Sequence, residues 1–144
     1  MEAKSLQEVL EENGAAVIQT VGFSMEPLLH ARESTVLLRK KDGPCRKNDV
    51  VLYIRPDGRY TLHRLVKAGP EWLAQGDYQL STENIREEWI IGVMEGYHPH
   101  PNSPFHSVHS TSYQMYVMML PLLRLWLRIR GCVGRFLRRK KETV

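Results

Sequence analysis

The sequence predicts a mainly β fold built of short antiparallel strands, with a short N-terminal helix and a C-terminal amphipathic helix. Runs rich in β-branched and aromatic residues recur between turn residues, roughly every 8 to 15 residues. A charged segment with a capping pattern precedes the first run, and the last thirty residues or so repeat apolar residues at helical spacing. The 144 residues fit one domain and can bury a core without disulfides or a metal.

The elements follow from local signals. Ser5 and Glu8 have the spacing of a capping box, and Gly14 is placed to end that helix. The turn "RPDGR" joins the third and fourth apolar runs into a hairpin. The polar, proline-rich stretch 97–112 is predicted to be a loop, and the helix that follows should kink at Pro121. Strands are predicted at 15–21, 34–40, 50–54, 60–66, 71–76 and 88–96.

Composition narrows the class of protein. With 42% hydrophobic and 25% charged residues, the chain is ordinary for a globular protein. Cys45 and Cys132 lie far apart without metal-ligand spacing, which favours a reduced, intracellular chain. No secretory signal opens the sequence. Four histidines lie in the proline-rich stretch, but their spacing matches no closed zinc motif, so no metal is expected. They are His98, His100, His106 and His109.

Charge divides the chain into an acidic body and a basic tail. Residues 1–112 contain 12 Lys/Arg and 15 Asp/Glu, whereas residues 113–144 contain 8 Lys/Arg and one Glu. The net charge of +4 therefore comes from the tail. The run "RRKK" alone does not predict a nucleic-acid partner, because the body is acidic and contains no recognition motif.

Three residues suggest nucleophilic catalysis. Ser24 in "GFSMEPLL" follows a predicted strand, and a serine hydroxyl needs a neighbouring base to become a good nucleophile. His63 in "YTLHRLV" is the only histidine in a predicted strand, and its ordinary pKa of about 6.5 suits a base at neutral pH. Asp77 follows a glycine at a strand end, and a carboxylate can orient such a histidine. Taken singly, each residue also fits a structural role.

Together these segments resemble the serine peptidase clan that contains signal peptidase I and the LexA-type repressors. "GFSMEP" is similar to the nucleophile box, and "DVVLYIRPDGRYTLHRLV" is similar to the paired strands that carry the base. "GDYQLSTE" followed by "IIGVM" is similar to the Gly-Asp box and the strand after it. The resemblance covers roughly residues 15–95 and implies a LexA/signal-peptidase-like β-fold.

The resemblance also implies roles for particular residues. Bacterial leader peptidases and LexA-type proteins use a lysine base, whereas His63 resembles the base of archaeal and eukaryotic-type signal peptidases. Ser24 is then the nucleophile and Asp77 the acid that orients the imidazole, with Glu83 as the less certain choice. Some members carry a serine two residues before the nucleophile; this chain has a glycine, so an oxyanion hole must use backbone N–H groups. The residues flanking the nucleophile are expected to contact substrate: Gly22, Phe23 and Met25.

The expected function is that of a serine endopeptidase, without a cofactor, that cleaves a peptide or a precursor-protein leader. Residues 1–96 would be the catalytic domain, 97–112 a Pro/His-rich loop and 113–144 a basic helical tail. One alternative is a non-catalytic peptide-binding or membrane-surface module that keeps the fold. Another is a LexA-like self-processing regulator, which would need a DNA-binding domain of roughly 60 residues before the peptidase; 23 residues precede Ser24.

The tail has two faces when projected as a helix. Arginines at 124, 128, 135, 138 and 139 cluster opposite Leu122, Leu125, Trp126, Ile129, Val133 and Phe136. Residues 113–141 are therefore expected to bind an anionic membrane surface, placing the chain in the cytoplasm and peripherally at the membrane. Two alternatives stay open: a helix packed on the protein's own body, and a short or tilted span.

Overall fold

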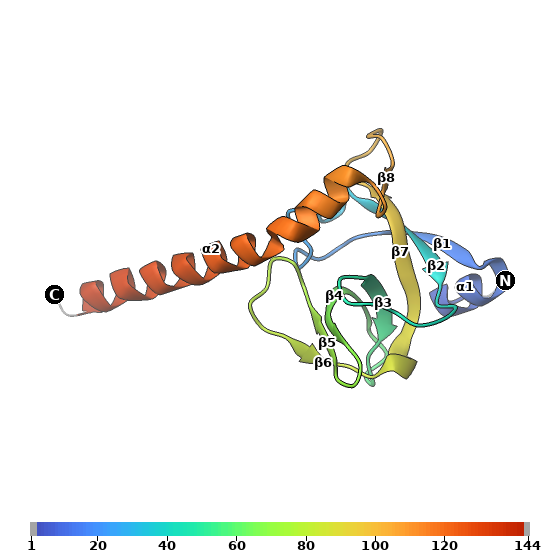
Figure 1. The fold of residues 1–144 in the computed structure, drawn as a ribbon, viewed down its shortest axis with the longest axis horizontal. Coiled ribbons are helices and arrows are strands. Elements are labelled where there is room, and N and C mark those ends of the chain that lie inside the picture. Colours follow the sequence, from blue (N-terminus) through green and yellow to red (C-terminus); the bar gives the residue numbers. More distant parts are fainter. Residues whose placement is uncertain (1–2, 143–144) are drawn as a thin grey trace.

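The computed structural model describes residues 3–142, which form one antiparallel sheet and two α-helices (Figure 1). The elements, in chain order, are α1 (Leu6–Asn13), β1 (Ala15–Gln19), β2 (Thr35–Lys40), β3 (Val50–Ile54), β4 (Tyr60–Ala68), β5 (Trp72–Gln75), β6 (Glu83–Asn84), the 3-10 helix η1 (Glu87–Trp89), β7 (Ile90–His98), β8 (His106–Ser107) and α2 (Thr111–Glu142).

All strand pairs are antiparallel, in the order β1-β2-β7-β3-β4-β5-β6, with β8 paired to β7. The long strand β7 joins the sheet's two halves because it pairs with β2 on one side and with β3 on the other. Irregular register in the β2–β7, β3–β7 and β4–β5 pairs bends these strands. The predicted mainly β class is confirmed.

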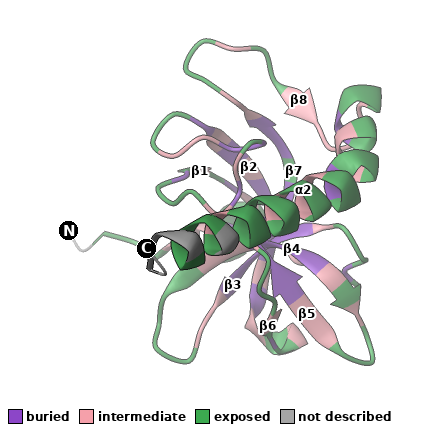
Figure 2. Ribbon diagram, turned by 90° about the vertical axis from the view of Figure 1, so that its left-hand side faces the viewer, coloured by how far each residue is buried: buried purple, intermediate pink, exposed green. Residues whose placement is uncertain are grey.

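The core has two clusters of buried residues, one on each face of β3. Along β3, Val50 and Leu52 enter one cluster and Val51 and Tyr53 the other, as expected for side chains that alternate along a strand. The first cluster includes residues of α1, β2, the Ser24 loop and α2, and the second joins β3, β4 and β5. Buried positions consequently follow the central strands (Figure 2).

The secondary-structure elements with strong local sequence signals were predicted correctly. Ser5 caps α1 through a complete capping box with Glu8, and Gly14 ends the helix in the left-handed conformation at φ 72°. The β3–β4 hairpin forms around "RPDGR". The segment 88–96 was placed too early, because η1 occupies its start and β7 continues to His98. The two-residue strands β6 and β8 were missed, since so short a strand has no detectable periodicity.

Helix α2 crosses the sheet with its first turns and then extends beyond the body (Figures 1 and 2). It begins two residues before the predicted tail and runs through Pro121. Tyr113 and Leu120 are buried where the helix meets the body. Within residues 3–142, no helix has the length and apolar character needed to cross a membrane.

Candidate active site

Ser24 lies in the turn-rich loop between β1 and β2, and the residues that follow it hold the loop in place. Met25, Leu28 and Leu29 are buried in the first core cluster. The base of the loop is closed by the N–H of Thr20, which donates to the carbonyl of Ser34 at 3.1 Å. The serine is thus presented by a segment that is fixed on both sides.

His63 lies on β4 and faces this loop. Its Nε2 is 3.1 Å from Oγ of Ser24, within hydrogen-bonding distance. The predicted approach of the serine and the histidine is therefore present. His63 is buried, it pairs with Val51 of β3, and from the next residue, Arg64, its strand also pairs with β5.

The other ring nitrogen of His63 contacts a tyrosine rather than a carboxylate. Nδ1 lies 3.2 Å from the hydroxyl of Tyr53, which in turn donates to Oε2 of Glu83 at 2.7 Å. A phenol has one hydrogen, and here it goes to Glu83. Tyr53 can therefore only accept a hydrogen bond from His63, which places the imidazole proton on Nδ1. Nε2 is left with a lone pair directed at Ser24.

Charge around this chain of hydrogen bonds keeps Glu83 ionised. Arg55 donates to both Glu83 oxygens, at 2.8 and 2.7 Å, and these bonds hold the pKa of the Glu83 carboxyl below its usual range. Burial lowers the pKa of His63, against an opposing pull from the negative charge of Glu83. A histidine in this setting is neutral at neutral pH and can accept a proton.

Asp77 does not orient His63, which corrects the sequence prediction. Its carboxylate accepts from Arg64 at 2.8 and 2.9 Å and from the hydroxyl of Tyr116 at 2.9 Å. Arg64 and Asp77 are both fully buried. Among the described residues Asp77 makes no hydrogen bond to His63. Its ion pair is with Arg64, the residue that follows His63 in β4. The second candidate, Glu83, is the acid that connects to the histidine, and it does so through Tyr53.

The residues on either side of Asp77, Gly76 and Tyr78, pack against the Ser24 loop. The N–H of Tyr78 donates to the carbonyl of Ser24 at 2.9 Å. A Cβ at Gly76 would lie 2.5 Å from that carbonyl oxygen and 2.9 Å from the Ser24 Cβ, closer than real side chains come. Glycine is required here because two backbones approach closely.

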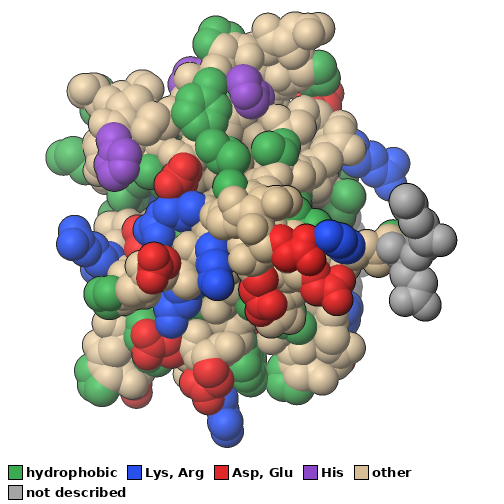
Figure 3. Space-filling model, turned by 90° about the vertical axis from the view of Figure 1, so that its right-hand side faces the viewer, with side chains coloured by type: hydrophobic (Ala, Val, Ile, Leu, Met, Phe, Trp, Pro, Cys, Tyr) green, Lys and Arg blue, Asp and Glu red, His purple; other side chains and the backbone are tan. Residues whose placement is uncertain are grey.

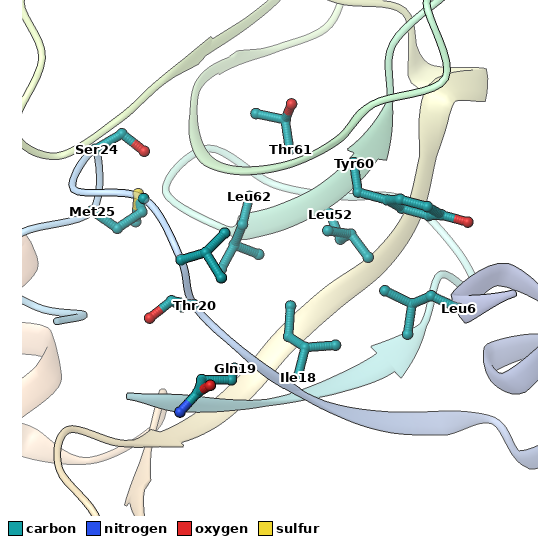
Figure 4. A pocket seen from close by; sticks show the side chains of 12 residues that line it. Leu6, Ile18, Gln19, Thr20, Ser24, Met25, Leu52, Tyr60, Thr61 and Leu62 are labelled. Carbon is teal, nitrogen blue, oxygen red and sulfur yellow. The ribbon is translucent and has the colours of Figure 1, made fainter. Parts of the chain in front are cut away.

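A groove of about 420 Å³ opens beside Ser24 (Figure 4). Its walls come from the end of β1 and the start of β4, and apolar side chains such as Ile18, Leu52 and Leu62 line it. Of the three residues that the sequence suggested as substrate contacts, Gly22 and Met25 line the groove and Phe23 does not. Phe23 is 72% exposed at the surface.

The remaining histidines form no centre of the kind that binds a metal. His100 pairs with Glu33 at 2.8 Å and stacks on His30 with 4.7 Å between ring centroids. His106 stacks on Tyr97 at 5.4 Å. Across residues 3–142, no three His, Cys, Asp or Glu side chains gather as a metal site requires.

Tyr53 and Arg55 were not predicted from the sequence, although a signal for Tyr53 is present in it. In the β3–β4 hairpin, Tyr53 pairs with Thr61 and Val51 pairs with His63. Tyr53 and His63 are therefore diagonal neighbours on one face, a relationship within reach of aromatic side chains. Extending the pairing outward from the "RPDGR" turn would have placed the tyrosine beside the histidine.

Comparisons with known proteins add no relative to this picture. No family model matches the sequence, and the search of curated proteins found no match.

Proposed function

We propose that this protein is a serine endopeptidase of the signal-peptidase type that cleaves a peptide or a precursor-protein leader. The observation that carries the proposal is the 3.1 Å separation between Oγ of Ser24 and Nε2 of His63. The Nδ1–H tautomer, supported by Tyr53 and Glu83, leaves Nε2 as the acceptor for the serine proton.

The reaction follows from this geometry. Oγ of Ser24 attacks the carbonyl carbon of the scissile peptide while its proton passes to Nε2 of His63. The imidazolium then gives that proton to the departing amine, and the C–N bond breaks to leave an ester on Ser24. Water, deprotonated by His63, hydrolyses the ester and restores both residues.

Charge in the transition state develops at two places. Burial lowers the pKa of His63, and the negative charge of Glu83, which reaches the imidazolium through Tyr53, opposes that lowering and stabilises the imidazolium. The oxyanion requires N–H donors. Within the described residues the backbone N–H of Ser24 has no acceptor, so it is available for this role.

The groove indicates an extended, apolar substrate. Strand β1 is the last strand of the sheet and, among residues 3–142, pairs only with β2, so the described part of the chain leaves its outer edge open toward the Ser24 loop. An extended peptide could add to this edge through main-chain hydrogen bonds. Ile18, Leu52 and Leu62 would then receive apolar side chains beside the scissile bond.

The direct test is incubation of the full chain with a peptide library, followed by mass spectrometry of the products. The proposal predicts discrete cleavage products that disappear with Ser24→Ala. Ser81→Ala is the matched control, because Ser81 is an exposed serine outside the site and its loss should leave cleavage unchanged. Peptides that bind in the groove but are never cut would instead identify a non-catalytic peptide-binding module.

A further inference from the structure

Helix α2 carries a continuous apolar face that the body does not cover. Nine large apolar side chains on it are between 51% and 78% exposed. At 3.6 residues per turn they fall within an arc of about 120°, and the 32-residue helix is about 48 Å long. This apolar stripe consists of Met115, Met118, Met119, Leu122, Leu125, Trp126, Ile129, Val133 and Leu137.

The helix contacts the body through its opposite side. Tyr113 and Leu120 are buried, and Tyr116 donates to Asp77 at 2.9 Å. Arg124 lies on the same side, with Nη2 3.9 Å from Asp77 Oδ1. The interface with the body thus leaves the stripe facing away, which excludes the alternative that the apolar face packs on this chain's own sheet (Figure 2).

Positive charge is concentrated on the same helix. Residues 113–144 carry eight Lys/Arg and one acid, against twelve Lys/Arg and fifteen Asp/Glu in the body. On the face of the body away from the helix's C-terminal end, acidic and basic side chains intermix (Figure 3). Arg128, Arg135 and Arg138 lie on the helix side opposite the stripe and are exposed where described.

We propose that α2 lies in the plane of an anionic bilayer surface, with the apolar stripe inserted among the lipids and the β body on the aqueous side. A long exposed apolar face combined with a cationic polar face is the pattern of interfacial helices. Anionic headgroups complement the charge of the helix, whereas a second copy would bring two strongly basic helices together. This surface is independent of the chemistry proposed for Ser24.

The docked helix is linked to the candidate active site by one arginine. Arg130 lies next to the stripe, with its guanidinium 5.4 Å from the ring centroid of Trp126. The same arginine donates to the hydroxyl of Tyr78 at 3.1 Å, and the N–H of Tyr78 holds the carbonyl of Ser24. The Ser24 loop therefore sits close to the membrane-facing side of the helix.

The test is co-sedimentation of the full chain with vesicles of equal parts phosphatidylglycerol and phosphatidylcholine, and with phosphatidylcholine alone. Binding should be strong only to the anionic vesicles and should weaken as salt rises from 0.1 M to 1 M, since the Debye length falls from about 10 Å to about 3 Å. The double variant Arg135→Gln/Arg138→Gln should bind roughly 30-fold more weakly.

Two further variants distinguish the contribution of the apolar stripe to vesicle binding from the contribution of total charge. Trp126→Asp/Ile129→Asp adds two negative charges to the stripe, which lowers the net charge by two, and should abolish binding. Lys67→Gln/Arg86→Gln lowers the net charge by the same amount at exposed positions on the body and should bind as the parent does. Ser24→Ala should also bind normally, so failure of the peptidase proposal would leave this result intact.

Three outcomes would overturn the proposal. One is equal binding to both vesicle types, and another is vesicle binding that survives Trp126→Asp/Ile129→Asp. The third is a chain that ignores vesicles and sediments as a dimer, with that double variant monomeric. This last result would assign the stripe to a second copy of the protein.

Discussion

Tyr53 and His63 lie diagonally across the β3–β4 hairpin, with the tyrosine hydroxyl 3.2 Å from Nδ1 of the histidine. Because the same hydroxyl donates to Glu83 at 2.7 Å, the pair fixes which imidazole nitrogen is protonated. A neutral side chain here occupies the place that a carboxylate holds in a Ser-His-Asp arrangement. The carboxylate of Glu83 acts on His63 indirectly, through the hydroxyl group of Tyr53.

Tyr53→Phe should lower the cleavage rate while the fold is retained. The ring still fills the core, but Nδ1–H loses its acceptor and the tautomer is no longer fixed. An unsatisfied buried donor costs about 1–3 kcal/mol, which corresponds to roughly a 5-fold to 160-fold loss in kcat. Steady-state kinetics would measure this, with circular dichroism as the check on folding. Unchanged kcat would mean that Tyr53 does not position His63.

The pH dependence of cleavage should report the buried histidine. Burial lowers the pKa of His63, and the base works only when neutral, so the rate should fall with acid at a midpoint below about 6.5. Glu83→Gln removes the charge that raises this pKa and should move the midpoint to still lower pH, with a lower plateau rate. The pH profile of kcat/KM measures both. A midpoint shifted to alkaline pH would indicate a lysine base instead.

Asp77→Asn should act mainly on stability, with only a small shift of the acid limb to lower pH. That shift comes from loss of the Asp77 charge, which is the least of the influences on the pKa of His63. Arg64 and Asp77 are fully buried, and breaking such a pair costs about 3–5 kcal/mol. Urea denaturation should show a large loss of unfolding free energy. Asp57→Asn, at an exposed pair with Arg59, is the matched control and should leave stability unchanged. If instead the Asp77 variant is fully stable but shifts the pH midpoint, Asp77 orients His63 after all.

Gly76→Ala should impair cleavage by displacing the nucleophile turn. The added methyl would lie 2.5 Å from the Ser24 carbonyl oxygen, so either the turn or the 76–78 segment must move. A displacement of about 1 Å near reacting groups can cost roughly a hundredfold in rate. Gly134→Ala meets nothing within 4 Å and should cleave normally. Wild-type kinetics for the Gly76 variant would show that the close approach has no bearing on the reaction.

The sequence was most informative where function and fold depend on local pattern. Capping residues predicted α1, the "RPDGR" turn predicted the β3–β4 hairpin, and alternation placed His63 in a strand. The acid could not be assigned in the same way. Asp77 and Glu83 are six residues apart in an irregular segment, and which one reaches the histidine depends on long-range partners. Arg64 and Tyr116 bind the first, and Arg55 and Tyr53 bind the second.

The structure of the tail was likewise only partly predictable from the sequence. Helical periodicity predicted two faces, and the apolar one is exposed along the helix. Periodicity could not say which side meets the body, because that side is set by Tyr113 and Tyr116, whose hydroxyls meet Arg64 and Asp77. The covered side of α2 therefore depends on a buried polar network as well as on apolar contacts of Tyr113 and Leu120.

The most direct test of the catalytic proposal is a double-mutant cycle on Ser24 and His63, measured as kcat/KM for a peptide that the wild-type chain cleaves. Ser24→Ala and His63→Ala should each lower the rate by several orders of magnitude, and the double variant should be little worse than either single one, because the two residues act as a unit. A Ser24→Ala protein that cleaves at the wild-type rate, or losses that simply add, would contradict the account.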